Sequence, residues 1–128
     1  ADTLSTILAK DPEKPTALFM HHPPFEIVGS KYPFQFEDWN TVDYLASVLK
    51  KNDQVKHLFC GHTHRNSTGK ILGVPASTTP SIATDLRLGE VSYGEQFKPV
   101  YQIHKFDGIR FKSKTVVCEI LEEIDLVG

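Results

Sequence analysis

The stretch TALFMHHPP, residues 16–24, decides the fold of this chain, because a short apolar run ends there in two histidines and two prolines. A continuous apolar run of this length predicts a buried strand, of the kind found in parallel sheets. A second run, VKHLFC at residues 55–60, is followed by Gly61-His62-Thr63-His64. Each of the two strands is therefore expected to deliver histidines at its carboxyl end.

The segment between the two strands predicts a loop over residues 25–39, rich in aromatic side chains, and then a helix. We expect Asn40 to cap this helix at its N-terminus and Asn52 to end it. Its apolar face consists of Val42, Leu45, Ala46 and Leu49. This order predicts a right-handed βαβ unit with parallel strands, in which sites collect beyond the carboxyl ends of the strands.

The two ends of the chain predict further elements. Residues 4–8 have the apolar spacing of a helix and resemble the tail of a longer one. Asp107-Gly108, between the strand-like runs 100–106 and 109–112, predicts a hairpin. The fold class is therefore α/β, a βαβ unit followed by a mostly antiparallel β part. We expect residues 1–118 to belong to one domain and residues 119–128 to be an acidic C-terminal tail.

The composition is that of an ordinary globular chain, with 128 residues, 40% apolar side chains, and 14 basic against 16 acidic side chains. This charge balance argues against a nucleic acid polymer as a partner, and no apolar run approaches the ~20 residues of a membrane span. Two cysteines, Cys60 and Cys118, are too few for a disulfide framework, although a single bridge stays open. We expect reduced thiols and a cytoplasmic protein.

The histidines are the candidate functional residues. On an extended segment His62 and His64 point the same way, and imidazole is a ligand for zinc, iron and manganese. An isolated pair with this spacing is equally compatible with two surface histidines. His21 favours the metal site, because it ends the neighbouring strand at the same edge of the sheet.

Two motifs carry a resemblance to a known family. MHHPPF at residues 20–25 and FCGHTHR at residues 59–65 resemble the last two motifs of the calcineurin-like metallophosphoesterases. The run from Leu72 to Ile82 is similar to the cyclic-nucleotide phosphodiesterase branch, and the resemblance covers residues 16–106. It implies a four-layer αββα sandwich around two metal ions (manganese, iron or zinc), with this chain as the C-terminal half.

The resemblance also implies roles for individual histidines. His21 and His62 match ligands of one metal ion, and His64 matches a ligand of the other. The family's remaining ligands come from the motifs D-x-H, G-D-x-x-D and G-N-H-[DE], which this sequence does not contain. We therefore expect the chain to be part of a longer domain. Alone, it is expected to hold one ion or none and to have little activity.

Two further residues are candidates beside the ligands. His22 is a candidate catalytic residue that faces the substrate or orients a neighbouring ligand, and a solvent-facing position is the alternative. Arg65 is a candidate for substrate binding, because its planar fork suits a phosphate oxygen, and a plain surface arginine is the alternative.

The resemblance implies metal-dependent hydrolysis of a phosphodiester, such as a 3′,5′-cyclic nucleotide, at a binuclear site to which this chain supplies three histidines. Two alternatives stay open. One is a non-catalytic half-domain that associates with itself or a partner and binds metal weakly or not at all, and the other is a phosphomonoesterase of the same superfamily. We expect a phosphodiester or nucleotide substrate, a homodimer, and no membrane partner.

Overall fold

The computed structural model describes residues 3–35, 38–89 and 98–119, which contain both helices and strands. They are α1 (Thr3–Ala9), β1 (Thr16–Met20), α2 (Trp39–Lys51), β2 (Val55–Cys60), β3 (Ser67–Ile71), β4 (Val74–Thr78), the 3-10 helix η1 (Thr84–Leu86), β5 (Val100–Phe106) and β6 (Phe111–Val117). The α/β fold class expected from the sequence is confirmed.

The strands form a four-stranded sheet of order β1-β2-β4-β3 and a two-stranded sheet of β5 and β6. β1 pairs with β2 in parallel, and β2 pairs with β4 in parallel, whereas β3 runs antiparallel to β4. The register aligns Phe19 with Phe59 and Met20 with Cys60. The predicted βαβ unit is therefore confirmed, and the carboxyl ends of β1 and β2 lie side by side.

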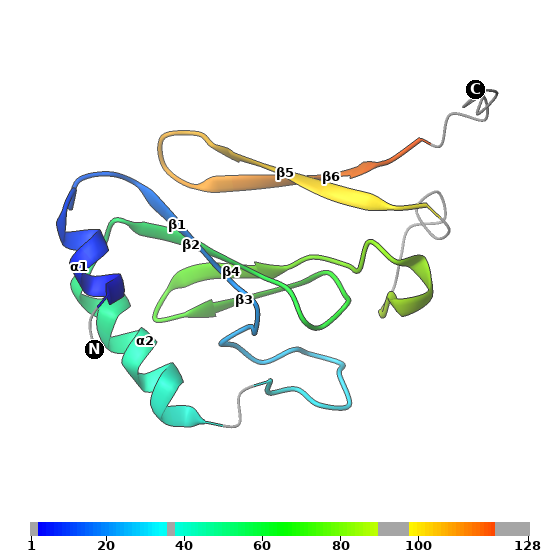
Figure 1. Ribbon diagram of the computed structural model, residues 1–128, viewed down its shortest axis with the longest axis horizontal. Coiled ribbons are helices and arrows are strands. Elements are labelled where there is room, and N and C mark those ends of the chain that lie inside the picture. Colours follow the sequence, from blue (N-terminus) through cyan, green and yellow to red (C-terminus); the bar gives the residue numbers. More distant parts are fainter. Residues whose placement is uncertain (1–2, 36–37, 90–97, 120–128) are drawn as a thin grey trace, which may run out of the picture.

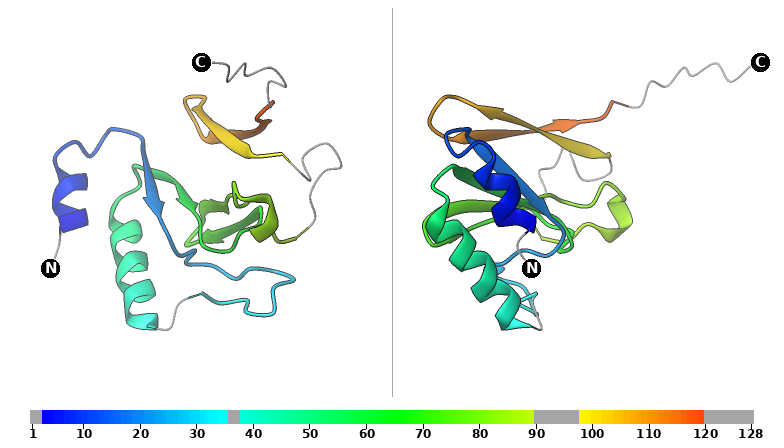
Figure 2. Two further views of the ribbon diagram at one scale, coloured as in Figure 1. Left: turned by 45° about the vertical axis from the view of Figure 1, so that its right-hand side comes forward. Right: turned by 60° about the vertical axis from the view of Figure 1, so that its left-hand side comes forward.

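The elements are stacked in layers around the four-stranded sheet. α2 and the loop that follows β1 lie on one side of this sheet, and the β5–β6 hairpin lies on the other (Figures 1 and 2). The main core lies between α2 and the sheet, where Leu45 and Leu49 pack with Leu58 and Ala76, and Leu8 of α1 joins them. No helix in the described part of the chain is long and apolar enough to cross a membrane.

α2 begins two residues earlier than the sequence predicts. Asp38 is the N-cap, because its carboxylate accepts a hydrogen bond from the backbone N–H of Asn40 at 2.9 Å while its own backbone is extended. The predicted cap at Asn40 is therefore wrong. The predicted end at Asn52 is confirmed, since its backbone N–H bonds to the carbonyl of Leu49 and its side chain to the carbonyl of Val48.

β1 is less buried than its apolar sequence predicts. Leu18 and Met20 pack against the core, but Phe19 points to the other face of the sheet and is 73% exposed. β1 is an outer strand of this sheet, and Phe59 beside it is only 4% exposed. A run of apolar residues predicts burial on both faces only where both faces are covered.

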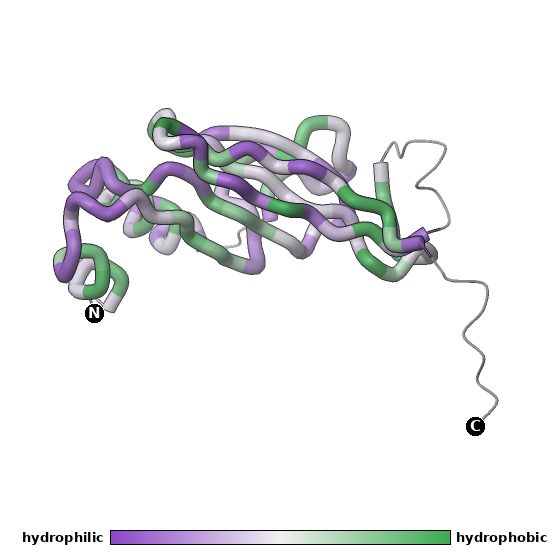
Figure 3. The backbone as a smooth tube through the Cα atoms, turned by 90° about the horizontal axis from the view of Figure 1, so that it is seen from above, coloured by the Kyte–Doolittle hydropathy of each residue, from purple (hydrophilic) through white to green (hydrophobic). Residues whose placement is uncertain are grey.

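The hairpin forms around Asp107-Gly108, as predicted. The Asp107 carboxylate accepts hydrogen bonds from the backbone N–H groups of Arg110 and Ile109 at 2.9 Å, which lowers the pKa of Asp107 to about 2. These bonds place Ile109 and Arg110 in the turn, so β6 begins at Phe111 and not at Ile109 as expected. Hydrophilic and hydrophobic stretches alternate along the hairpin strands (Figure 3). The predicted acidic tail lies, apart from Glu119, outside the described residues.

Candidate metal centre

Three histidines gather beyond the carboxyl ends of β1 and β2. His21, His22 and His62 each offer one ring nitrogen, and these three atoms lie within 4.8 Å of one another. His21 Nε2 and His62 Nδ1 are 3.2 Å apart, and the ring centroids of His22 and His62 are 4.2 Å apart. All three residues are exposed, so the cluster is open to a metal ion or a ligand from solvent.

The parallel pairing of β1 and β2 brings these residues together. It extends one step beyond the strands, where the backbone N–H of Gly61 donates to the carbonyl of His21 at 2.9 Å. This bond places the backbone of Gly61, which precedes His62, directly beside the backbone of His21. The prediction that His21 and His62 meet at one edge of the sheet is therefore confirmed.

The segment after β2 is a turn and not the extended chain assumed for the two histidines. His62 and His64 have φ of 66° and 55°, in the left-handed region, and Thr63 N–H donates to the Gly61 carbonyl at 2.7 Å. Residues i and i+2 then no longer point the same way. Within the described part of the chain, His22 and not His64 completes the cluster with His21 and His62.

The backbone carbonyls of His64 and Arg65 both accept hydrogen bonds that fix these residues in place. The His64 carbonyl accepts from Leu88 N–H at 2.7 Å, and the Arg65 carbonyl accepts from the buried Thr78 hydroxyl at 2.7 Å. Both side chains are half-buried. Arg65 Nε is buried without a hydrogen-bond partner in the structure as described. A phosphate contact by Arg65 stays a prediction.

The histidines influence one another electrostatically. Burial, followed by the charges of His22, His21 and His64, lowers the pKa of His62. A lowered pKa keeps the imidazole neutral near pH 7, with a lone pair free for a metal ion. His64 is thus close enough to act on His62, although its ring stands outside the cluster.

The donor set fits a transition metal ion. Two imidazole nitrogens bound 2.0–2.1 Å from a tetrahedral zinc ion would stand ~3.3 Å apart. The observed 3.2 Å between His21 Nε2 and His62 Nδ1 matches this separation, and it is equally the length of a hydrogen bond between the two rings. His22 was expected to be a catalytic residue, and its ring position makes it a candidate ligand as well. The pair His21-His22 at the end of β1 was the sequence feature that could have indicated His22 as a ligand.

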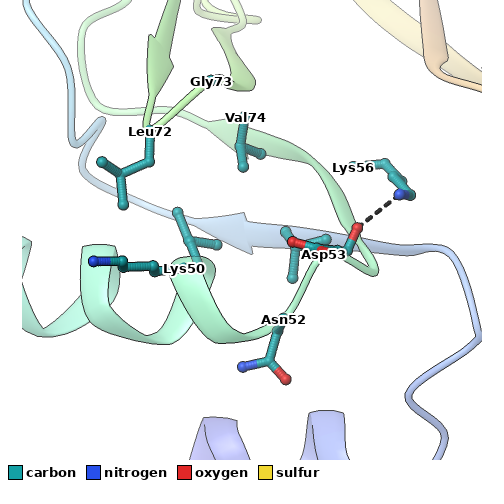
Figure 4. Close-up of a pocket in the computed structure, with 9 residues that line it drawn as sticks. Lys50, Asn52, Asp53, Lys56, Leu72, Gly73 and Val74 are labelled. Carbon is teal, nitrogen blue, oxygen red and sulfur yellow. Dashed lines mark hydrogen bonds between the residues drawn. The ribbon is translucent and has the colours of Figure 1, made fainter.

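Two of the larger hollows in the described part of the chain lie at opposite ends of β2. One, of about 510 Å³, borders His21 on the hairpin side of the sheet, where Phe19, Phe59 and His104 form an aromatic wall. The other, of about 730 Å³, lies between the end of α2 and the β3–β4 turn (Figure 4). There Lys56 Nζ donates to the carbonyl of Asp53 at 2.6 Å. This second hollow is at the start of β2, away from His62, so it is not part of the histidine cluster.

Comparison with known proteins supports the resemblance seen in the two motifs. The chain is 37% identical over 101 residues to a probable glycerophosphodiester phosphodiesterase, GpdQ, of Arcobacter nitrofigilis. The match covers 76% of this chain and 37% of the relative, so the chain spans little more than a third of that relative's length. No family model matches the chain. GpdQ is a calcineurin-like metallophosphoesterase, which confirms the resemblance to that superfamily.

Proposed function

We propose that this chain supplies histidine ligands to a metal centre that hydrolyses phosphodiesters. The observation that carries the proposal is the approach of His21 and His62 to 3.2 Å, at the edge of the sheet where two parallel strands end. The similarity to a probable glycerophosphodiester phosphodiesterase supports the same reaction class.

The proposed roles follow from the positions of the side chains. His21 and His62 would hold a metal ion, with His22 or His64 as the third imidazole. A manganese, iron or zinc ion bound there would supply positive charge to the phosphate and acidify a water molecule. Arg65 would contact a phosphate oxygen. The remaining ligands of a two-metal site would come from residues outside this sequence.

We propose the substrate class first broadly and then more narrowly. The broader level is a diester of phosphoric acid, which the relative's name supports. At the finer level, a glycerophosphodiester and a 3′,5′-cyclic nucleotide are the two candidates. The hollow beside His21, with the Phe19 and Phe59 rings on its wall, offers an apolar surface for the organic group of either diester.

A second candidate function is a non-catalytic half-domain that associates with a second copy of itself. The observation that favours it is Phe19, which is 73% exposed on an outer strand of the sheet. In this case the chain would bind metal weakly or not at all, and it would form a homodimer.

Titration calorimetry with Zn²⁺ and Mn²⁺ tests the proposal directly. We expect His21→Ala and His62→Ala to abolish binding, whereas His104→Ala, outside the cluster, should keep it. Comparison of His22→Ala with His64→Ala then identifies the third ligand. In a protein that also carries the remaining metal ligands, hydrolysis of bis(p-nitrophenyl) phosphate against p-nitrophenyl phosphate separates a phosphodiesterase from a phosphomonoesterase. Wild-type chain that binds neither metal and sediments as a dimer would support the second candidate.

A further inference from the structure

We infer that Phe25 is a positioning residue for the histidine cluster, because its ring sits on the backbone of Gly69 in β3 and thereby anchors the segment that carries His21 and His22. The inference rests on the proposed metal-binding role of these histidines.

The Phe25 ring packs directly on the backbone of Gly69. A Cβ atom at this position would lie 2.7 Å from Cγ and 2.9 Å from Cε2 of Phe25, closer than real Cβ atoms approach other heavy atoms. Phe25 is 7% exposed and belongs to the main core. The ring can therefore occupy this place only because residue 69 has no side chain.

A short proline segment connects Phe25 to the histidines. Only Pro23 and Pro24 separate His22 from Phe25, and both prolines are buried. The pyrrolidine ring fixes φ at each of these residues, which leaves fewer free dihedral angles between Phe25 and His22 to absorb a displacement of the ring. At the other end of the segment, the His21 carbonyl is bound by Gly61 N–H at 2.9 Å. The histidine pair is thus held from both sides.

The position of Gly69 within the sheet argues against a merely local packing role. β3 is the strand farthest from β1 in the order β1-β2-β4-β3, so Phe25 reaches from the end of one outer strand to the other outer strand. Glycine weakens a strand interior, and it often marks a place where another group approaches the backbone closely. Here the approaching group is the ring of Phe25, whose backbone leads back to the cluster.

The test replaces Gly69 and reads the histidines individually. Gly69→Ala should displace the Phe25 ring, shift the ring-nitrogen NMR signals of His21, His22 and His62, and weaken Zn²⁺ binding about tenfold or more. His104, in β5 of the separate two-stranded sheet, is the internal reference whose signal should stay. Thr68→Val is the matched control, since this neighbouring β3 residue is exposed. Phe25→Leu removes the ring from the same contact and should shift the same signals, and the double variant Gly69→Ala/Phe25→Leu should lose little more affinity than either single variant, because both changes act on one contact.

The possible results separate the positioning role of Phe25 from the proposed metal binding. Unmoved His21 and His62 signals in Gly69→Ala, or an equal shift at His104, would overturn the positioning role. If Gly69→Ala fails to fold, Phe25→Leu alone applies the same test, because it removes the ring and keeps most of the core volume. Wild-type chain that binds no Zn²⁺ contradicts the proposed function instead, and the NMR signals of the metal-free chain still test the role of Phe25.

Discussion

Phe19 and Phe59 form a matched pair for a test of how the two sheets are held together. They are the same residue type, are aligned in the β1–β2 register, and their ring centroids are 5.1 Å apart. Phe59 lies between two histidine rings, with centroid distances of 4.1 Å to His57 and 3.7 Å to His104. Since His104 belongs to the hairpin, the Phe59 ring links the hairpin to the larger sheet.

The expected costs of the two alanine substitutions differ severalfold. Phe59 is 4% exposed, so Phe59→Ala should lower the free energy of unfolding by about 3–5 kcal/mol through lost burial and the cavity left behind. Phe19 is 73% exposed, so roughly a quarter of its surface is shielded, and Phe19→Ala should cost about 0.5 kcal/mol. The free energy of unfolding of a domain is about 5–15 kcal/mol, so Phe59→Ala alone can unfold a marginal chain.

Urea unfolding followed by circular dichroism measures both costs, and it should be repeated at low and high protein concentration. Equal losses for the two variants at low concentration would refute the reasoning, because they would show that Phe19 is covered in solution. A cost for Phe19→Ala that grows with protein concentration would instead support self-association through β1.

Three further predictions concern other parts of the molecule. Burial raises the pKa of the Cys60 thiol to about 12; we therefore expect the folded chain to resist iodoacetamide at pH 8 and to react in urea, as mass spectrometry can show. Burial lowers the pKa values of His57 and His104, and the charge of His104 adds to the shift at His57. The unfolded chain then binds more protons, so stability should fall as the pH drops below ~6.5 and become constant below the folded pKa values. The urea midpoint measures this dependence, and replacement of both residues by glutamine should weaken it, leaving the part due to His62, whose pKa is also lowered. Thr78→Val leaves the Arg65 carbonyl without its 2.7 Å hydrogen bond, and we expect a loss of about 1–2 kcal/mol in thermal unfolding; no loss would show that water replaces the hydroxyl.

The sequence predicted most elements because their signals are local. The apolar runs of β1 and β2, the spacing of the α2 core face and the Asp107-Gly108 turn each lie within a few residues, and each element is present in the structure. The exposure of Phe19 could not be predicted in this way, since it depends on which elements cover the second face of the sheet.

The candidate site was predicted in part. The convergence of His21 and His62 follows from parallel strands alone, and the structure confirms it. The position of His64 relative to His62 depends on the left-handed φ values of these two residues. Such values are uncommon outside glycine, so the spacing of the two histidines alone did not indicate them. The contact of Phe25 with Gly69 joins residues far apart in the sequence, so a single sequence contains no pattern that reveals it.

The sequence separation of the two central histidines has a consequence for folding kinetics. His21 and His62 are 41 residues apart, and the crossover through α2 must be completed before β1 and β2 can pair and bring the imidazoles together. Closing such a long loop is slow compared with forming a helix or a hairpin. The pair of imidazoles that would receive a metal ion is therefore absent during early folding. Metal binding should slow unfolding and lengthen the lifetime of the native state, with little effect on the folding rate.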